Sequence, residues 1–288
     1  MAWPIIMHVN CCEQGQTIDD ICRNCARWGF DGVELRRKRS GVKENAENYL
    51  DSISKAIEKY KVRNVLFGSP GVQRLEGNKA EREQEIEEMI RFFEMASARF
   101  RLTVCNTFAG PIINPDKSVP YSEYTRHGSF IAKKEHWDWA VNCYKVLGNL
   151  AQKLGFVLSF ETHMCYLDDI MESTTRLVKE IDNPAVGINL DYGNLVYFDN
   201  PPSMKDAVDL AGDRLYYVHL KNSIELPGGK RITAGLGEGD INNREYLKIL
   251  KESGYSGPIC IEVPCDGDRE WYAKKDLYYL QKLIEEIS

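Results

Sequence analysis

The sequence lacks a basic excess and any long apolar run, and each absence excludes a class of protein. Its net charge is −6, from 37 lysines and arginines against 43 aspartates and glutamates. A protein that mainly binds duplex nucleic acid needs a basic surface to displace counterions, so we do not expect nucleic acid as a partner. No run approaches the roughly 18 apolar residues that a membrane span requires, and residues 1–10 lack the basic start of a leader peptide. We therefore expect a cytoplasmic protein without a membrane partner.

A cysteine framework and a nucleotide-binding glycine motif are also missing. The nine cysteines are odd in number and scattered, which excludes a complete set of paired disulfides and favours a reducing compartment. Cys22 and Cys25 form a C-x-x-C, but no second such pair follows at the spacing of a zinc ribbon. No G-x-G-x-x-G follows the first apolar run, so the main sequence evidence for a dinucleotide-binding fold is missing.

What the chain does contain is a strict alternation of short apolar runs with stretches of helical period. Eight runs are predicted as strands and about eight stretches as helices. This alternation is typical of an α/β protein with a parallel sheet, and eight units favour a closed (β/α)8 TIM barrel over an open doubly wound sheet. No linker or shift of composition divides the chain, so we expect one barrel domain spanning residues 1–288.

Two segments interrupt the alternation. Residues 109–126 contain three prolines and two tyrosines without a clear period, and residues 222–240 are rich in glycine. Loops this long inside a compact domain are usually functional. We expect the first segment to form a lid or a wall of a binding site, and the second to be an irregular excursion.

Four successive predicted strands, the fifth to the eighth, end in a residue of a type that binds metals. These residues are Glu161, Asp191, His219 and Glu262. The C-terminal ends of barrel strands meet at one mouth, so we expect the four side chains to lie together there. Carboxylate and imidazole ligands suit a divalent cation such as Mn²⁺, Mg²⁺, Co²⁺ or Zn²⁺. Taken singly, each glutamate could instead form a salt bridge, Asp191 a turn and His219 a buried hydrogen bond.

Several motifs in register along the chain resemble those of one family. They are G-F-D-G-V-E-L, S-F-E-T-H, N-L-D-Y-G-N, Y-V-H-L-K-N, G-L-G-E-G-D-I-N and I-C-I-E-V. This set is similar to the xylose isomerase-like TIM barrel superfamily, and in particular to its sugar phosphate isomerase/epimerase branch. The resemblance implies one bound divalent ion, Mn²⁺ first among the candidates, held by the four residues above. It also implies that Glu161 and Glu262 remove and return a proton on opposite faces of a substrate carbon, through an enediolate held on the metal.

The activity that the resemblance implies is isomerisation or epimerisation of a small sugar, ketose or cyclic polyol. Two departures from the family's ketose 3-epimerases keep a second activity open. Asn194 stands where they carry a histidine, and residues 223–225 stand where an arginine is expected, whereas this chain has His163 and Lys221. The E-x-H motif is compatible with His163 as a general base, as in lyase members of the family. The alternative is a metal-dependent lyase or dehydratase of a keto-sugar, including C-glycoside deglycosidase-type cleavage.

Further polar residues are candidates for substrate contacts. Lys221 is predicted to bind a hydroxyl or phosphate group of the substrate, and Asn194 and His8 are predicted to line the pocket. Glu34 either contacts sugar hydroxyls at the mouth or belongs to a buried ion pair. Glu238, in the glycine-rich segment, serves either a turn or the substrate.

Two functions of other classes stay open on the sequence alone. Barrels of this kind also serve as non-catalytic assembly subunits, in a homo-oligomer or beside a different subunit. The endonuclease IV group belongs to the same superfamily, but it uses up to three metals and more histidine ligands than the five histidines here readily supply.

Overall fold

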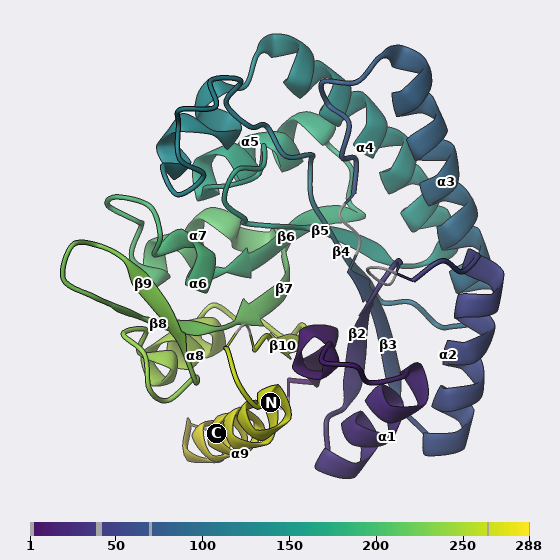
Figure 1. Ribbon diagram of the computed structural model, residues 1–288, viewed down its shortest axis with the longest axis vertical. Coiled ribbons are helices and arrows are strands. Elements are labelled where there is room, and N and C mark those ends of the chain that lie inside the picture. Colours follow the sequence, from purple (N-terminus) through teal and green to yellow (C-terminus); the bar gives the residue numbers. More distant parts are fainter. Residues whose placement is uncertain (1–2, 39–41, 69–70, 264, 288) are drawn as a thin grey trace.

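The computed structural model describes the chain except for residues 1–2, 39–41, 69–70, 264 and 288 (Figure 1). Eight parallel strands form a closed barrel in the order β1-β10-β7-β6-β5-β4-β3-β2, which confirms the (β/α)8 prediction. No described helix is long and apolar enough to cross a membrane. The barrel strands are β1 (Ile5–His8), β2 (Gly32–Arg36), β3 (Asn64–Gly68), β4 (Val104–Thr107), β5 (Val157–Glu161), β6 (Val186–Asp191), β7 (Leu215–Leu220) and β10 (Ile259–Ile261).

Helices surround this barrel in Figure 1 and follow the strands along the chain. The α-helices are α1 (Ile18–Trp28), α2 (Ala46–Tyr60), α3 (Lys79–Ser97), α4 (Lys134–Leu154), α5 (Met171–Ile181), α6 (Tyr192–Leu195), α7 (Met204–Ala211), α8 (Asn243–Glu252) and α9 (Arg269–Ile287). Short 3₁₀ helices are η1 (Val9–Cys12), η2 (Tyr124–Arg126), η3 (Gly128–Ile131) and η4 (Gly212–Arg214).

Local signals at the helix ends set where the helices begin and stop, as α1 illustrates. The Thr17 hydroxyl accepts the backbone N–H of Asp20, whose carboxylate accepts the N–H of Thr17 in return, and this capping box starts α1. The helix stops at Gly29, whose φ of +94° is a left-handed conformation that glycine adopts without strain. Cys22 and Cys25 lie on the buried face of α1 as free thiols, so this C-x-x-C serves the core.

The interior of the barrel changes from apolar to polar along the strand direction. Near the N-terminal ends of the strands, the side chains inside the barrel pack in one cluster. It is made of Ile6, Leu66, Val104, Tyr217 and Cys260. Side chains alternate between the two faces of a strand, so the residue two positions further on points inward again. On four of these strands that next position is polar, namely at His8, Asn106, His219 and Glu262. The upper interior is therefore polar, and the candidate site forms there.

The proline-containing segment, residues 109–126, and the 3₁₀ helix η3 that follows it are fixed to the loop that follows β5. The backbone N–H groups of Ala109 and Ser129 donate to the carboxylates of Asp168 and Asp169, at 2.8 and 3.0 Å respectively. Both aspartates are buried, and this burial raises the pKa of Asp169 to about 6. The segment is therefore anchored by hydrogen bonds to buried carboxylates, and its role as a lid or a wall of a binding site stays a prediction.

We expect Gly128→Ala to lower the free energy of unfolding by about 2–4 kcal/mol, because the added methyl group has no room. Gly128 has a φ of +60°, and a Cβ there would lie 2.1 Å from Asp169 Oδ2 and 2.7 Å from the Tyr166 carbonyl oxygen. Gly155→Ala is the matched control, because its φ is +82° and no described heavy atom lies within 4 Å of a Cβ. The control should cost about 1 kcal/mol. Urea unfolding measures both variants, and equal losses would contradict the steric explanation.

A two-stranded antiparallel hairpin follows β7, where the sequence predicts only an irregular excursion. It consists of β8 (Asn222–Glu225) and β9 (Arg231–Ala234), and it projects from the body of the molecule in Figure 1. The prediction is wrong here because strands of four residues are too short for an alternating pattern to stand out beside glycine-rich turns. Arg231 stabilises the hairpin by donating to Glu225 and Asp240 at 2.8 and 2.9 Å.

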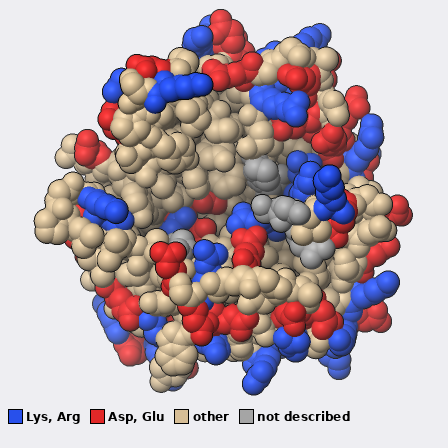
Figure 2. All heavy atoms as spheres, in the orientation of Figure 1, with Lys and Arg blue, Asp and Glu red and all other residues tan. Residues whose placement is uncertain are grey.

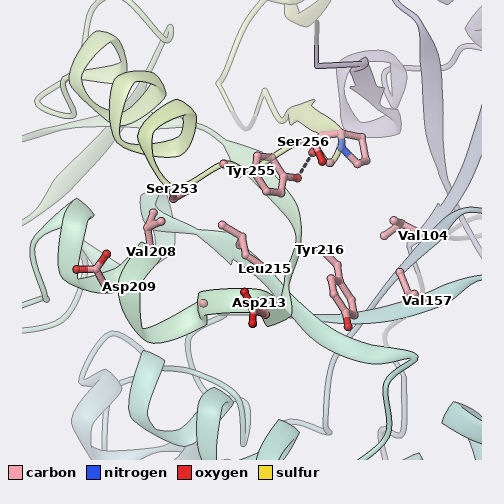
Figure 3. A pocket seen from close by; sticks show the side chains of 14 residues that line it. Val104, Val157, Val208, Asp209, Asp213, Leu215, Tyr216, Ser253, Tyr255 and Ser256 are labelled. Atoms are coloured by element: carbon pink, nitrogen blue, oxygen red, sulfur yellow. Dashed lines mark hydrogen bonds between the residues drawn. The ribbon is translucent and has the colours of Figure 1, made fainter. Parts of the chain in front are cut away.

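A hollow of about 620 Å³ lies at the end of the barrel opposite the polar interior (Figure 3). It is lined by the first residues of three strands, Val104, Val157 and Leu215, and by residues 253–258 before β10. Its described lining residues include no histidine and no glutamate. Active sites of such barrels lie at the C-terminal mouth, while the opposite end serves stability, so we assign no chemistry to this hollow.

Candidate functional site

The four residues at the C-terminal ends of β5, β6, β7 and β10 converge at the barrel mouth. One ligand atom from each of Glu161, Asp191, His219 and Glu262 lies within 4.8 Å of the others. The first three residues are buried, whereas Glu262 is half-buried. Figure 2 shows this face of the molecule, where acidic and basic side chains meet in the hollow at its centre.

The atoms of this cluster lie close enough together to serve as the ligands of one ion. His219 Nδ1 lies 3.4 Å from Glu161 Oε2 and 3.6 Å from Glu262 Oε2. It lies 4.0 Å from Asp191 Oδ2. Among the described residues, His219 Nδ1 is a buried atom without a hydrogen bond, and Asp191 Oδ2 and Glu262 Oε2 face the ammonium of Lys221. Atoms that share an ion at about 2.1 Å lie about 3.0–3.4 Å from one another, so a small contraction of the cluster would hold a divalent cation.

Lys221, two positions after His219, neutralises part of the negative charge of the cluster. Its Nζ atom forms ion pairs with Asp191 Oδ2 at 2.8 Å and Glu262 Oε2 at 2.7 Å. Burial alone would lower the pKa of Lys221, but the two carboxylates raise it above its usual range, so the group is an ammonium. Burial raises the pKa of Asp191 to about 7, whereas for Glu262 the charge of Lys221, together with His219 and His8, outweighs burial and lowers the pKa. The ammonium offsets part of the negative charge of the three carboxylates, and a divalent ion would offset more of it.

Asparagine side chains orient two of the carboxylates. Asn106 and Asn194 donate to opposite oxygens of Glu161, at 2.6 and 3.2 Å. Asn10 donates to Glu262 Oε1 at 3.1 Å. Sequence reasoning misses Asn106, although a polar residue at an inward-facing strand position is a signal that could have found it. Asn194 is buried and bound to Glu161, so its predicted contact with substrate stays a prediction.

Glu34 belongs to a buried pair, the second of its two sequence interpretations. The residue is fully buried, and its Oε2 atom accepts from His219 Nε2 at 2.9 Å and from the Tyr217 hydroxyl at 2.7 Å. His8 is also buried, with its ring centroid 5.7 Å from that of His219 and its Nε2 3.8 Å from Glu34 Oε1. Both side chains therefore lie inside the barrel beside His219, and the predicted contacts of Glu34 and His8 with substrate stay predictions.

His163 stands two residues after Glu161, packed between aromatic rings. Its ring lies edge-on to Phe108 and Tyr166, with centroid distances of 5.4 and 5.1 Å. Burial, followed by the positive charge of Lys221, lowers the pKa of His163. The imidazole is therefore neutral at pH 7 and able to accept a proton.

Glu238 takes part in a turn, one of the two roles that the sequence allows, and its predicted contact with substrate stays a prediction. Its carboxylate pairs with Lys275 Nζ at 2.6 Å and accepts the backbone N–H of Gly235 at 3.3 Å. The side chain is 54% exposed, so it lies at the surface of the glycine-rich turn.

The fold and the cluster together define a class of protein. It is a (β/α)8 barrel whose mouth carries a group of carboxylates and a histidine that could bind a divalent metal ion. The chain belongs to the xylose isomerase-like TIM barrel family, whose sequence model matches residues 22–283. The family inferred from the motifs is thereby confirmed.

Relatives of the chain include enzymes of two kinds. An inosose dehydratase from Clostridium botulinum is 24% identical over 283 residues, which cover 92% of this chain and 89% of the relative. The structure of D-allulose 3-epimerase from Methylomonas sp. superposes with a TM-score of 0.74 at 18% identity, over 98% of this chain and 100% of that one. A xylose isomerase-like TIM barrel protein from Mycobacterium smegmatis, in complex with magnesium, gives a TM-score of 0.74 at 20% identity, over 100% of this chain and 98% of that one. At these identities the likeness to the two structures shows the fold alone.

Proposed function

We propose that this protein is a divalent-metal-dependent enzyme that transfers a proton next to the carbonyl group of a small sugar, ketose or cyclic polyol, as an isomerase or epimerase. The observation that carries the proposal is the convergence of four ligand-type atoms within 4.8 Å. When bound, the ion polarises the carbonyl group and lowers the free energy needed to remove the neighbouring proton. Mn²⁺ is our first choice, with Mg²⁺, Co²⁺ and Zn²⁺ as alternatives. The residues proposed to hold it are Glu161, Asp191, His219 and Glu262.

We propose that two carboxylates of the cluster act as base and acid from different sides of the substrate. Glu161 extends from β5 and Glu262 from β10, and β6 and β7 lie between these two strands in the barrel. A substrate carbon held between them would present one face to each carboxylate, which is the arrangement that inverts a stereocentre. One glutamate then removes the proton and the other delivers a proton to the opposite face.

Lys221 and His163 are the side chains that we propose to orient the substrate. The Lys221 ammonium is a donor for a hydroxyl or carbonyl oxygen, and it already lies beside Glu262. The neutral His163 imidazole can accept a hydrogen bond from a second hydroxyl, and the rings of Phe108 and Tyr166 fix its position. Together they would hold the reacting carbon close to the glutamates.

Elimination is the second candidate activity. An inosose dehydratase matches 92% of the chain, and His163 provides a neutral base near the cluster. The first step is the same proton removal, but a hydroxyl group or an aglycone then leaves the adjacent carbon. His163, after taking the proton, would return it to the departing hydroxyl oxygen or, for a C-glycoside, to the aglycone carbon at which the bond breaks, so that proton and leaving group are both accounted for.

Product analysis in D₂O tests the proposal and separates the two activities. The purified chain with added Mn²⁺ is incubated with a panel of ketoses, inososes and 3-keto-glycosides. An isomerase or epimerase would place deuterium on the reacting carbon and release an isomer, whereas a dehydratase or lyase would release an unsaturated product or an aglycone. If no member of the panel exchanges deuterium or gives a product, the result favours a non-catalytic assembly subunit instead.

A further inference from the structure

Glu34 lies outside the four-residue cluster, yet it is bound to the one imidazole within it. Glu34 is on β2 and His219 is on β7, and β1 and β10 separate these strands along the shorter path around the barrel. The 2.9 Å hydrogen bond between them therefore crosses the barrel interior. A carboxylate in such a buried position needs partners, and the structure supplies His219 and Tyr217.

This hydrogen bond decides which nitrogen of His219 faces the cluster. A neutral imidazole carries one N–H, and an ionised carboxylate only accepts hydrogen bonds, so Nε2 must carry the hydrogen when it bonds to Glu34. In the neutral form, which a histidine must adopt to bind a metal ion, Nδ1 then keeps its lone pair. Nδ1 is also the atom that faces Glu161 and Glu262, at 3.4 and 3.6 Å.

We propose that Glu34 is a positioning residue for the metal centre, because it holds His219 in the tautomer and orientation that present the Nδ1 lone pair to the ion. This inference rests on the metal centre of the proposed function. Tyr217 holds Glu34 in turn, because its hydroxyl donates to the same carboxylate oxygen at 2.7 Å. Partners of this kind behind a metal-binding histidine usually contribute 10–100-fold to metal affinity.

Calorimetric titration with Mn²⁺ tests the inference. It compares the full-length wild type with the variants Glu34→Ala and Glu34→Gln. The alanine variant loses the acceptor, and we expect it to bind Mn²⁺ about 10–100-fold more weakly than the wild type. The glutamine variant keeps an acceptor oxygen in the same shape, so we expect it to recover most of this loss. Tyr217→Phe removes only the donor that holds Glu34, and should weaken binding by up to about tenfold.

A spectroscopic readout, independent of turnover, reports the tautomer directly. In ¹⁵N-labelled protein loaded with Zn²⁺, the wild type should show a His219 Nε2–H proton protected from exchange, and Glu34→Ala should lose it. An unchanged Mn²⁺ affinity in folded Glu34→Ala, or a glutamine variant as weak as the alanine variant, would overturn the positioning role. If the wild type itself binds no Mn²⁺, the proposed metal centre is wrong, and so is the role of Glu34, which depends on it. If the wild type binds Mn²⁺ and all variants match it, only the role of Glu34 fails.

Discussion

Replacing Glu262 by glutamine is expected to lower kcat by about 10³-fold on the substrate that the panel identifies. The change removes the charge from a proposed metal ligand that is also a proposed acid–base group, and acid–base catalysis alone contributes about 10²–10⁴-fold. It also takes from Lys221 the carboxylate that lies 2.7 Å from its Nζ atom, so the ammonium loses one of two close ion pairs. Steady-state kinetics at saturating Mn²⁺ measure the effect.

Glu252→Gln makes the same chemical change at an exposed position of α8 and is the matched control. Its kcat should stay close to the wild-type value, because exposed substitutions away from a site rarely alter it. A Glu262→Gln enzyme that keeps more than a tenth of the wild-type kcat would show that Glu262 is neither a ligand nor an acid–base group. Deuterium exchange in D₂O, measured for Glu161→Gln and Glu262→Gln, shows which glutamate removes the proton. Only the variant that lacks the proton-removing glutamate should lose deuterium exchange entirely.

Removal of divalent metal is expected to abolish turnover and to lower the melting temperature by about 5–10 °C. At a metal concentration 100 times the Kd, binding adds about 2.7 kcal/mol to the free energy of unfolding. A chain of this size gains roughly 2–4 °C in melting temperature for each kcal/mol. Without the ion, the negative charges of the cluster are balanced only in part by Lys221. Dialysis against EDTA, metal analysis and thermal unfolding with and without Mn²⁺ measure both effects.

Asp191→Asn and Asp213→Asn show whether the metal effect belongs to this cluster. Asp191 is buried within the cluster, whereas Asp213 is exposed in η4. We expect the Asp191 variant to lose most of the stabilisation by Mn²⁺, and the Asp213 variant to keep it. Full activity in protein that contains less than about one ion per ten chains would contradict a metal-dependent reaction.

Much of the fold could be predicted because its signals lie between neighbouring residues. The capping box of Thr17 and Asp20, and the stop at Gly29, can each be recognised within a few positions. The exception is the β8–β9 hairpin, where four-residue strands leave too little pattern to separate them from the surrounding turns.

From the sequence, the candidate site could be predicted only as a set of residues at the ends of strands. Glu161 and Glu262 were recognisable because a charged residue that ends an apolar run is unusual, and the barrel rule brings such ends together. Asn106 gave a signal as a polar residue at an inward-facing strand position, but its role, like that of Tyr217, became clear only once its partner was known. The position of Glu34 was left between two interpretations for the same reason.

By itself, the sequence determined the alternation of strands and helices, the residues at the strand ends and, through its motifs, the family. The tertiary structure alone decided which side chains hold one another in the barrel interior. Glu34 meets His219 across 185 positions of the chain, and Asn106 meets Glu161 across 55. Periodicity and strand-end polarity are properties of adjacent residues, whereas these hydrogen bonds depend on closure of the barrel and on the register of its strands.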